Sequence, residues 1–442
     1  MKKVVLLSIE SVKRDLDSRL LLADRLADAG YTVYVGYSRK IFSLLCYLQN
    51  SIYIGRFMSL GGSELDKKIL DICYKNNNHF HYLHDEGGFL FSGDYKGYSK
   101  IIYPLDYLSH PGVKSILFWG KKQLDVLKDD MHTSLLSKSF VTGKYRFEMY
   151  KSKDLNLDIP ETNDIVLMGR FSEPNPVSDD IKPFTKAALD IFTRSMIQDN
   201  GSKFISEMMK SWIKSTQEYT HFIDLIFNIA TRYSDKRIII RPHPAESHEI
   251  YNFLINFFPN LTLDTNSDVR TTIVESKIII HTECTTGIEA CLLQKPTINF
   301  RPLKGVYPDY EVSGAKNAGI ICTNIDEVVE QINSFSDGMV FKFQEPKIEE
   351  LLINFNSNIS AYDNIFAVLK NYQIDSESSF SISSFFKNLP IKRLRFFIGD
   401  IFRLSPLRFS LANLKNKNLL KVKHIKIRNK FTKKYNLIKV SR

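Results

Sequence analysis

Three short polar motifs each follow an apolar, strand-like run and carry side chains that could do chemistry. The first, Arg241-Pro242-His243-Pro244, comes directly after residues 237–240. In an open parallel sheet ligands bind beyond the carboxyl ends of the strands, and the two prolines fix the backbone where it leaves the sheet. We expect His243 to point into that crevice with Arg241 nearby, a pair of donors that suits a phosphate. The alternative is a histidine that only caps a loop.

The second motif joins an apolar run to a helical pattern. Residues 281–287 read His-Thr-Glu-Cys-Thr-Thr-Gly. Hydroxyls, a glycine and free amide groups at a helix N-terminus form an anion site through hydrogen bonds and the helix dipole. The predicted nucleotide ligands are Thr282, Thr285, Thr286 and Gly287, with Glu289 placed to reach a ribose hydroxyl. Threonine is also an ordinary N-cap, so the motif gains weight from following the Arg-Pro-His-Pro strand in the same sheet.

The third motif, Asp85-Glu86-Gly87-Gly88, follows residues 79–84. Its glycines let the backbone approach a substrate closely, which makes Gly87 a candidate substrate contact. Repulsion between adjacent carboxylates and partial burial raise the pKa of one of them toward that of a working base. We predict Asp85 or Glu86 as that base, and a polar turn with solvated acids is the alternative.

The elements that position these motifs alternate between strands and helices. In the N-terminal part, β-branched or aromatic runs are predicted as strands at residues 4–9, 32–37, 51–54, 79–84, 115–119 and 139–142. A helical pattern over residues 18–29 lies between the first two and ends at Gly30. Strand, helix and strand in this order predict a parallel sheet covered by helices.

A second set of elements follows the polar stretch 151–162, which marks a domain boundary. Strands are predicted at residues 164–168, 237–240, 261–263, 277–280, 297–300 and 319–322, and helices at 247–257, 287–293 and 326–332. Residues 187–233 are predicted to be mostly helical. The predicted fold class is α/β, with two Rossmann-like domains at 1–155 and 156–372 and a basic helical tail at 373–442.

The basic charge of the chain is concentrated in the tail. The formal charge is +11, but residues 383–442 carry 17 Lys and Arg and a single acid, Asp400. The remainder is mildly acidic, which argues against a broad basic footprint for a nucleic-acid backbone. No nucleic-acid partner is expected.

The tail also has a pattern typical of helices that bind membrane surfaces. Residues 391–404 place large apolar side chains on one helical face with Lys392 and Arg403 opposite, and residues 421–434 continue with Lys, Arg and isolated aliphatics. We predict binding to an anionic membrane surface, with about 1 kcal/mol for each Lys or Arg near it. The alternative is a helix docked on the body followed by a disordered basic end.

Other features narrow the class of protein. No apolar run approaches the ~18 residues of a transmembrane helix, and charged residues interrupt the N-terminal apolar region too early for a signal peptide. Five scattered cysteines without a CxxC pair fit a reducing cytoplasm and predict no metal site. Because the chain has no GxGxxG, Walker loop or zinc signature, no bound cofactor is expected, and hydride transfer and ATP hydrolysis are not expected either.

Several motifs together resemble the bacterial surface carbohydrate biosynthesis proteins, in order over about residues 1–350. They are Ser8-Ile9-Glu10, residues 14–23, Asp85-Glu86-Gly87, Phe118-Trp119-Gly120, residues 141–147, Arg241-Pro242-His243-Pro244 and residues 285–290. The pattern is also similar to bacterial sialyltransferases and Kdo transferases, which share an acidic motif, a His-Pro motif and a Ser/Thr motif. In this chain the third motif carries threonines where paired serines are often seen.

The resemblance implies a GT-B fold with a cleft between two domains, the C-terminal one binding a CMP-activated acidic sugar. Carried over by position, Asp85 or Glu86 matches the acid/base pair. His243 matches the nucleotide-phosphate ligand and possible leaving-group acid. Thr285 and Thr286 match the phosphate-binding hydroxyls.

The resemblance also places Glu10, Arg14 and Asp17 at the end of the first strand, facing the cleft. A solvated or ion-paired face is the alternative for these three side chains. In a retaining mechanism with a covalent intermediate, Asp17 or Glu86 would be the nucleophile. Arg170 is predicted either to contact the donor or to be a structural arginine.

These features predict a metal-independent glycosyltransferase at the inner face of a bacterial cytoplasmic membrane. The donor would be CMP-Kdo or a related CMP-linked acidic sugar, and the acceptor a lipid-linked surface polysaccharide such as O-antigen or capsule. Two alternative enzyme classes are an isomerase resembling the UDP-sugar 2-epimerases and a polyol-phosphate transferase with a CDP-linked donor. A non-catalytic membrane scaffold is a third alternative.

Overall fold

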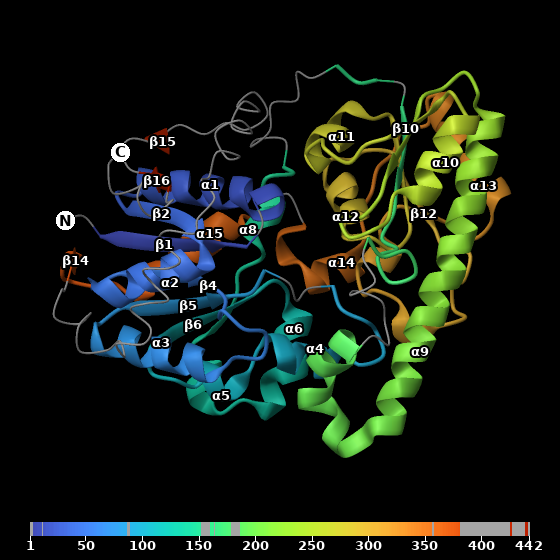
Figure 1. Cartoon of the computed structure of the whole chain (residues 1–442). Coiled ribbons are helices and arrows are strands. Elements are labelled where there is room, and N and C mark those ends of the chain that lie inside the picture. The colour runs from blue at the N-terminus through green and yellow to red at the C-terminus, as the bar shows by residue number, and fades with distance from the viewer. Residues whose placement is uncertain are drawn as a thin grey trace. The chain divides into compact units, whose positions relative to one another are not determined.

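The computed structural model describes residues 3–10, 12–85, 89–151, 160–162, 164–177, 186–355, 358–380, 425–426 and 438–440. The chain forms two compact units, shown in Figure 1. Unit 1 comprises Met1–Gly88, Tyr95–Leu157 and Glu349–Arg442, and unit 2 comprises Phe89–Asp94 and Asp158–Ile348.

The described part of unit 1 forms an eight-stranded sheet in the order β15-β16-β2-β1-β4-β5-β6-β7. Its bounds are β1 (Val4–Ile9), β2 (Thr32–Tyr37), β4 (Ile52–Gly55), β5 (His79–Leu83), β6 (Val113–Phe118), β7 (Ser139–Val141), β15 (Ile425–Lys426) and β16 (Ile438–Val440). The strands from β2 to β7 are parallel neighbours, whereas β16 runs antiparallel to β2. A short separate pair joins β3 (Leu48–Gln49) to β14 (Ser379–Phe380).

Helices cover both faces of this sheet (Figure 1). They are α1 (Val12–Asp28), α2 (Ser38–Tyr47), α3 (Glu64–Lys75), α4 (Tyr95–Ile102), α5 (Leu105–Leu108), α6 (Lys121–Leu127), α7 (Thr133–Leu136), α8 (Tyr145–Glu148) and α15 (Ala361–Asn371). Because both faces are covered, the central strands β1, β4 and β5 are buried along their whole length. Gly30 ends α1 as predicted, with a left-handed φ of 91° that glycine adopts without strain.

Unit 2 is built on a six-stranded parallel sheet in the order β10-β9-β8-β11-β12-β13. The strands are β8 (Ile165–Met168), β9 (Ile238–Arg241), β10 (Leu261–Leu263), β11 (Ile278–His281), β12 (Thr297–Phe300) and β13 (Ile320–Cys322). This is the strand order of Rossmann folds that bind nucleotides, and it reverses between β8 and β11. Ligands of such sheets bind beyond the carboxyl ends of the strands at that switch point.

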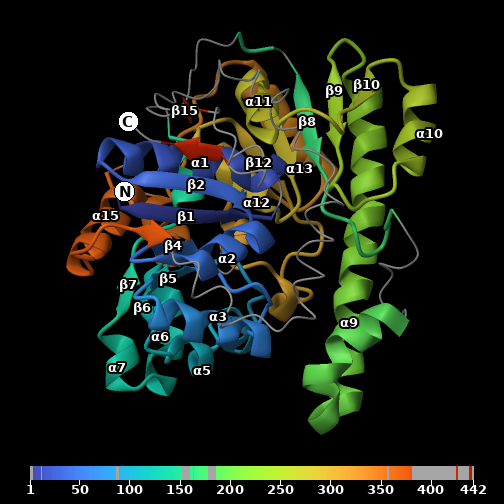
Figure 2. The same cartoon turned by 60° about the vertical axis from the view of Figure 1, so that its left-hand side comes forward.

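The helices of unit 2 are α9 (Lys186–Arg232), α10 (Glu249–Phe257), α11 (Val269–Glu275), α12 (Thr285–Leu292) and α13 (Ile325–Ser336). Figure 2 shows α9 extending well past the sheet, with α10 beside its C-terminal part. Phe227 of α9 packs against Phe258, directly after α10, with their ring centroids 5.4 Å apart.

The predicted fold class is confirmed: each unit is a Rossmann-like α/β domain. Strands β1, β2, β10 and β12 have the predicted bounds, and the helix predicted over residues 187–233 is α9. The end of the second domain differs from the prediction of residue 372. The structure assigns the chain from Glu349 onward, including α15, to unit 1, while α14 (Pro346–Leu351) spans the boundary.

The described parts of the tail differ from the predicted basic helix. Residues 425–426 and 438–440 are strands, and the side chains of Ile438 and Val440 are buried against the unit 1 sheet. The apolar and basic segment 391–404, which is the basis of the membrane prediction, lies outside the described residues. Among the residues that are described, no helix is both long and apolar enough to cross a bilayer.

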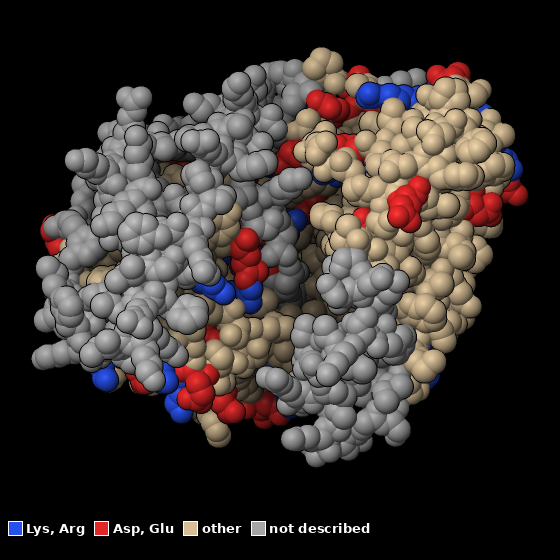
Figure 3. Space-filling view, viewed as in Figure 1, with Lys and Arg blue, Asp and Glu red and all other residues tan. Residues whose placement is uncertain are grey.

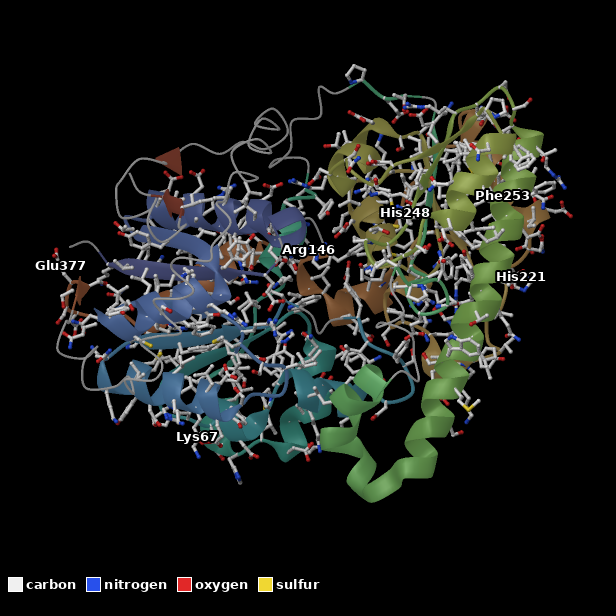
Figure 4. The ribbon with its side chains drawn as sticks, in the orientation of Figure 1. Lys67, Arg146, His221, His248, Phe253 and Glu377 are labelled. Carbon is white, nitrogen blue, oxygen red and sulfur yellow. The ribbon has the colours of Figure 1, made fainter. Side chains whose placement is uncertain are left out.

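The outer surface of unit 2 exposes several aromatic side chains. Phe253 and Phe257 on α10 are more than half exposed, and their rings pack against each other at 4.8 Å. Figure 4 places Phe253 of α10 and His221 of α9 along the same side of unit 2, and Figure 3 shows scattered Asp and Glu side chains there, with Lys and Arg only at its margins. This face therefore carries no concentration of positive charge.

Candidate functional site

The carboxyl ends of β8, β9 and β11 lie side by side at one edge of the unit 2 sheet, because β8 pairs in parallel with both of its neighbours. The chain continues from them as residues 169–171, 241–244 and 282–287, respectively. We call residues 282–287 the hydroxyl loop. The first and third are joined directly, since Arg170 Nε donates to the Thr282 carbonyl at 2.7 Å. Only one strand, about 5 Å wide, separates the Arg-Pro-His-Pro exit from the β11 exit. Two of the predicted motifs therefore share one sheet edge.

A buried carboxylate, Glu246, holds the exits of β8 and β9 together. One of its oxygens accepts the backbone N–H groups of Phe171 and His243, at 2.6 and 2.9 Å, and the other accepts the Tyr251 hydroxyl at 2.6 Å. Burial raises the pKa of Glu246, against the lowering effect of these hydrogen bonds. The backbone of Gly169 passes so close that a Cβ there would lie 3.0 Å from the carboxylate.

His243 is exposed at the end of β9, consistent with the proline-braced exit predicted from the sequence. Its Nδ1 accepts the backbone N–H of Ala245 at 3.2 Å, which assigns the ring proton to Nε2. Desolvation by the surrounding loop lowers the pKa of His243, so the neutral ring is favoured. The side chain therefore presents an Nε2–H donor, while its role as a phosphate ligand stays a prediction.

Arg241 is engaged differently from the phosphate contact predicted for it. Its guanidinium forms an ion pair with Asp264 at 2.5 Å and donates to the Thr272 hydroxyl and the Ser267 carbonyl. A bidentate-capable guanidinium pairs readily with a carboxylate at a strand exit. In this structure Arg241 thus stabilises the loop after β10.

The hydroxyl loop contains two hydroxyl groups without hydrogen-bond partners among the described residues. Thr282 is 2% exposed, and its Oγ1 is buried without a partner; Thr286 Oγ1 is buried and unpartnered too. Thr285, by contrast, is exposed at the start of α12. Leaving a buried hydroxyl unpaired costs about 1–3 kcal/mol, so such groups call for a ligand or a water molecule.

Two other predicted ligands of this motif lie deeper in unit 2. Gly287 is buried beneath the imidazole of His281, whose Nδ1 accepts the Cys284 N–H at 3.1 Å. Glu289 is fully buried in α12. The structure thus separates the motif into exposed, half-buried and core positions.

Behind the hydroxyl loop lies a buried network of alternating charges. Glu283 receives ion pairs from Arg301, Lys214 and Arg170, at 2.8, 3.2 and 3.6 Å. Burial alone would raise the pKa of Glu283, but the three cations hold it below its usual range. Glu218 pairs with both Lys214 and Arg170, at 2.6 and 2.8 Å.

Glu283 also has an unusual backbone. Its φ is +46°, in the left-handed region that non-glycine residues rarely adopt. The backbone N–H of Glu283 donates to Asn299 Oδ1 at 3.1 Å. Such outliers persist only where the surroundings over-determine them, and here the ion pairs and this hydrogen bond do so.

In the acidic motif of unit 1, the surroundings of Asp85 differ from those predicted. Asp85 is buried and is held by Arg19, at 2.9 Å, and by Lys144, at 2.7 Å. Burial alone would raise the pKa of Asp85, but the two cations outweigh it and hold the pKa well below its usual range. The prediction that repulsion raises this pKa toward a working base is therefore wrong for Asp85. Its carboxylate is ionised and shared between these two cations.

The other unit 1 candidates are placed only in part. Glu10 follows β1, is exposed and forms an ion pair with Arg56. Asp17 is half-buried on α1, and Arg14 belongs to the same helix. Glu86 and Gly87 lie outside the described residues.

The sequence analysis does not identify the residues that hold the β8 and β9 exits and the hydroxyl loop in place. Glu246 stands two residues after the Arg-Pro-His-Pro motif, and its spacing of three from His243 is the signal that could have found it. Lys214 and Arg301 are distant in sequence from the hydroxyl loop, and no local sequence pattern predicts their contacts with it. Among the described residues, no group of three or more His, Cys, Asp or Glu side chains could hold a metal ion.

Two successive Rossmann-like domains, the second with a polar strand-exit site, define the GT-B class of α/β proteins. No protein-family model matches the chain, and the search of curated proteins found no match.

Solved structures with a similar fold include three proteins of carbohydrate chemistry. UDP-GlcNAc 2-epimerase from Methanocaldococcus jannaschii is 12% identical, with 84% of this chain and 100% of that chain covered and a TM-score of 0.47. The wall teichoic acid polymerase TagF is 10% identical, with 84% and 90% covered and a TM-score of 0.47. UDP-GlcNAc 2-epimerase from Neisseria meningitidis, solved with UDP-GlcNAc, is 11% identical, with 84% and 100% covered and a TM-score of 0.44. At these identities the likeness concerns the fold alone.

Proposed function

We propose that the chain is a transferase that binds the phosphate of a nucleotide-activated donor at the β8, β9 and β11 exits of unit 2. The donor group passes to an acceptor in the synthesis of a bacterial surface carbohydrate. The observation that carries the proposal is the pair of buried, unpartnered hydroxyls of Thr282 and Thr286 beside the N-terminus of α12. A phosphate oxygen would satisfy both, and the helix dipole favours its charge.

The charges near this site fit a ligand held mainly by neutral donors. Arg170 and Lys214 are each paired with Glu218 and Glu283, and Arg241 is paired with Asp264. Hydroxyls, backbone amides and the His243 Nε2–H are then the groups that face the phosphate. Such preorganised donors bind an anion without a metal ion.

The finer prediction, transfer of a CMP-linked acidic sugar such as Kdo to a lipid-linked polysaccharide, is part of this proposal. Since Asp85 is committed to its ion pairs, we assign the role of acceptor base to Glu86. A general base must lie within hydrogen-bond reach of the acceptor hydroxyl when the substrates are bound.

Nucleotide binding tests the proposal first. We expect CMP, CDP, UDP or GDP to raise the melting temperature of the full chain, because a ligand that binds only the folded state stabilises it. Thr282→Val should weaken that affinity by about tenfold to a hundredfold, since a hydrogen bond to a charged group contributes roughly 1.5–3 kcal/mol. The same change should leave the unliganded protein as stable as the parent or more so, because it removes an unpaired buried hydroxyl.

Thr231→Val is the matched control, since Thr231 is exposed near the C-terminal end of α9 and belongs to none of the predicted motifs. It should bind nucleotide within about twofold of the parent, as surface substitutions usually have small effects. If no nucleotide stabilises the chain, or if Thr282→Val binds as tightly as the parent, the phosphate site is not at the hydroxyl loop.

Acceptor dependence then separates transfer from isomerisation. A 2-epimerase turns over UDP-GlcNAc without an acceptor, whereas the transferase releases free nucleotide from its sugar donor rapidly only when an acceptor is present. Acceptor-independent conversion of UDP-GlcNAc would replace the proposal with the isomerase. Glu86→Gln should abolish transfer while leaving nucleotide affinity unchanged.

We also propose that the basic tail holds the protein on the cytoplasmic face of the membrane. The full chain should float with vesicles of phosphatidylglycerol and phosphatidylethanolamine, and a full-length chain with the Lys and Arg residues of 391–434 replaced by Gln should not. Equal flotation of the two chains would show that the tail is not the anchor.

A further inference from the structure

A segment from the N-terminal half of the sequence is built into the nucleotide-binding unit. Residues 89–94, which we call the strap, lie between β5 and α4 in sequence, both of which belong to unit 1. The strap itself belongs to unit 2. It pairs with residues 309–313, since the backbone N–H groups of Ser92 and Gly93 donate to the carbonyls of Glu311 and Asp309, at 3.0 and 2.9 Å.

The fit between the strap and this segment is close on both sides. The Ser313 N–H donates back to the Leu90 carbonyl at 2.8 Å, and Phe91 and Val312 form an antiparallel bridge. Gly93 approaches Asp309 so closely that a Cβ at residue 93 would lie 2.4 Å from the Asp309 Cβ. A contact this short requires glycine at residue 93 for the strap to dock.

The strap is joined to the hydroxyl loop by a continuous series of charged contacts. Lys316 Nζ contacts Ser92 Oγ and Glu311, each at 3.1 Å. The other oxygen of Glu311 pairs with Arg301. Arg301 in turn pairs with Glu283 at 2.8 Å, within the hydroxyl loop. Each of these acidic and basic groups therefore has at least two partners.

A second contact joins the same two segments without Arg301. The backbone N–H of Val312, which bridges Phe91, donates to the Glu283 carboxylate at 3.3 Å. Glu283 is the residue with the left-handed backbone, and it directly follows Thr282 with its unpartnered hydroxyl. The conformation at residue 283 sets the direction in which the chain leaves Thr282 toward Thr286. Its ion pairs are therefore positioned to fix where the two hydroxyls lie.

We propose that the strap and Lys316 are positioning elements of the anion site, which hold the hydroxyl loop in its binding conformation through Glu311, Arg301 and Glu283. This inference rests on the proposed function for the identity of the ligand. None of the positioning groups needs to touch the nucleotide. Loss of the strap contacts should therefore loosen the hydroxyl loop and weaken binding without removing a ligand contact.

The test compares Lys316→Met with Lys304→Met. Both changes remove one lysine charge from the connection between β12 and β13, but Lys304 is exposed and its side chain forms no hydrogen bond or ion pair with the described residues. We expect Lys316→Met to weaken nucleotide affinity about threefold to thirtyfold, in the range of substitutions along a coupled network. Lys304→Met should stay within about twofold of the parent. Lys316→Arg should restore most of the affinity, because it keeps the charge beside Glu311 and Ser92.

Hydrogen exchange of the unliganded protein provides a second measurement that needs no nucleotide. Lys316→Met and Ser92→Ala should each speed amide exchange in residues 282–287, while exchange in β8 and β9 stays unchanged. Unchanged exchange in the hydroxyl loop for both variants would overturn the positioning role, whatever the affinities. If the parent binds no nucleotide but the exchange effect is present, the proposed function fails and the positioning role stands.

Discussion

The imidazole of His281 occupies the space in which a side chain at residue 287 would lie. A Cβ built on Gly287 would come within 2.2 Å of His281 Nε2. The ring is fixed there by two hydrogen bonds, from Nε2 to the Ala318 carbonyl at 2.9 Å and from the Cys284 N–H to Nδ1 at 3.1 Å. The packing of α12 against His281 of β11 therefore requires glycine at residue 287.

Gly287→Ala should therefore destabilise unit 2, although alanine is a better helix former than glycine. Overpacking of a buried site costs about 1–3 kcal/mol, which exceeds the ~1 kcal/mol gain in helix propensity. Urea unfolding followed by the fluorescence of Trp212, in a Trp119→Phe background, measures the change in this unit. Thr285→Ala in the same helix is the control and should shift the free energy of unfolding by less than about 0.5 kcal/mol. A stabilised Gly287→Ala protein would show that the ring moves aside freely.

The stability of unit 2 should fall as the pH is lowered from 6.5 to about 4. Burial lowers the pKa of His281 to about 4, against the raising effects of the Ala318 carbonyl and Glu283. Between these pH values the unfolded chain binds a proton that the folded state does not, so the free energy of unfolding decreases with falling pH. The loss from this group is on the order of 3 kcal/mol and is absent above pH 6.5.

His281→Gln serves as the comparison, because glutamine can donate to the Ala318 carbonyl but does not titrate. The variant should be less stable at pH 7 and should lose less stability between pH 6.5 and 4.5. Unit 1 has its own buried histidine, His81, whose pKa burial lowers to about 3. Because His281→Gln leaves His81 unchanged, the pH dependence of unit 1 stability should be the same in the parent and the variant. Parallel pH profiles for the parent and the variant would show that His281 is not the group responsible.

Asp85→Asn should unfold unit 1 far more readily than removal of a mere catalytic base would. The change leaves Arg19 and Lys144 buried without their shared carboxylate, and breaking a buried ion pair costs about 3–5 kcal/mol. Urea unfolding in a Trp212→Phe background, in which Trp119 reports on unit 1, measures the loss. Asp125→Asn, at an exposed ion pair with Lys128, should cost less than about 1 kcal/mol. A fully stable but inactive Asp85→Asn protein would restore the catalytic assignment.

The sequence predicts the α/β class and the main strands of both sheets, because most of these strands are short runs of β-branched or aromatic residues. Several helices of unit 1, such as α2 and α3, have no prediction. The strand exits followed from the same pattern, which is why His243 and the hydroxyl loop were found at one sheet edge. Ion pairs between residues far apart in the sequence could not be predicted. Asp85 looks like one of two repelling acids until Arg19 and Lys144 are placed beside it.

The same limit applies to the positively charged residues of unit 2. Arg241 stands in a motif that suits a phosphate, but Asp264, 23 residues later, engages its guanidinium. Glu283 appeared as one polar residue among several, and its left-handed backbone depends on Arg301 and Lys214. Charge and helical periodicity predict the tail, and neither shows that residues 438–440 add a strand to β2.

That C-terminal strand leads to a final prediction. Ile438 and Val440 are buried, and β16 covers the edge of β2 that would otherwise expose its backbone groups. Val440→Ala should lower the free energy of unfolding of unit 1 by about 2 kcal/mol, from lost burial and the cavity left behind. Trp119 fluorescence in urea, again in the Trp212→Phe background, measures it. Leu60→Ala removes more apolar atoms from the same unit, but Leu60 is 60% exposed and its loss should cost less than about 0.5 kcal/mol. If Val440→Ala is no more destabilising than Leu60→Ala, residues 438–440 do not contribute to the core, and the whole tail is free to act at the membrane.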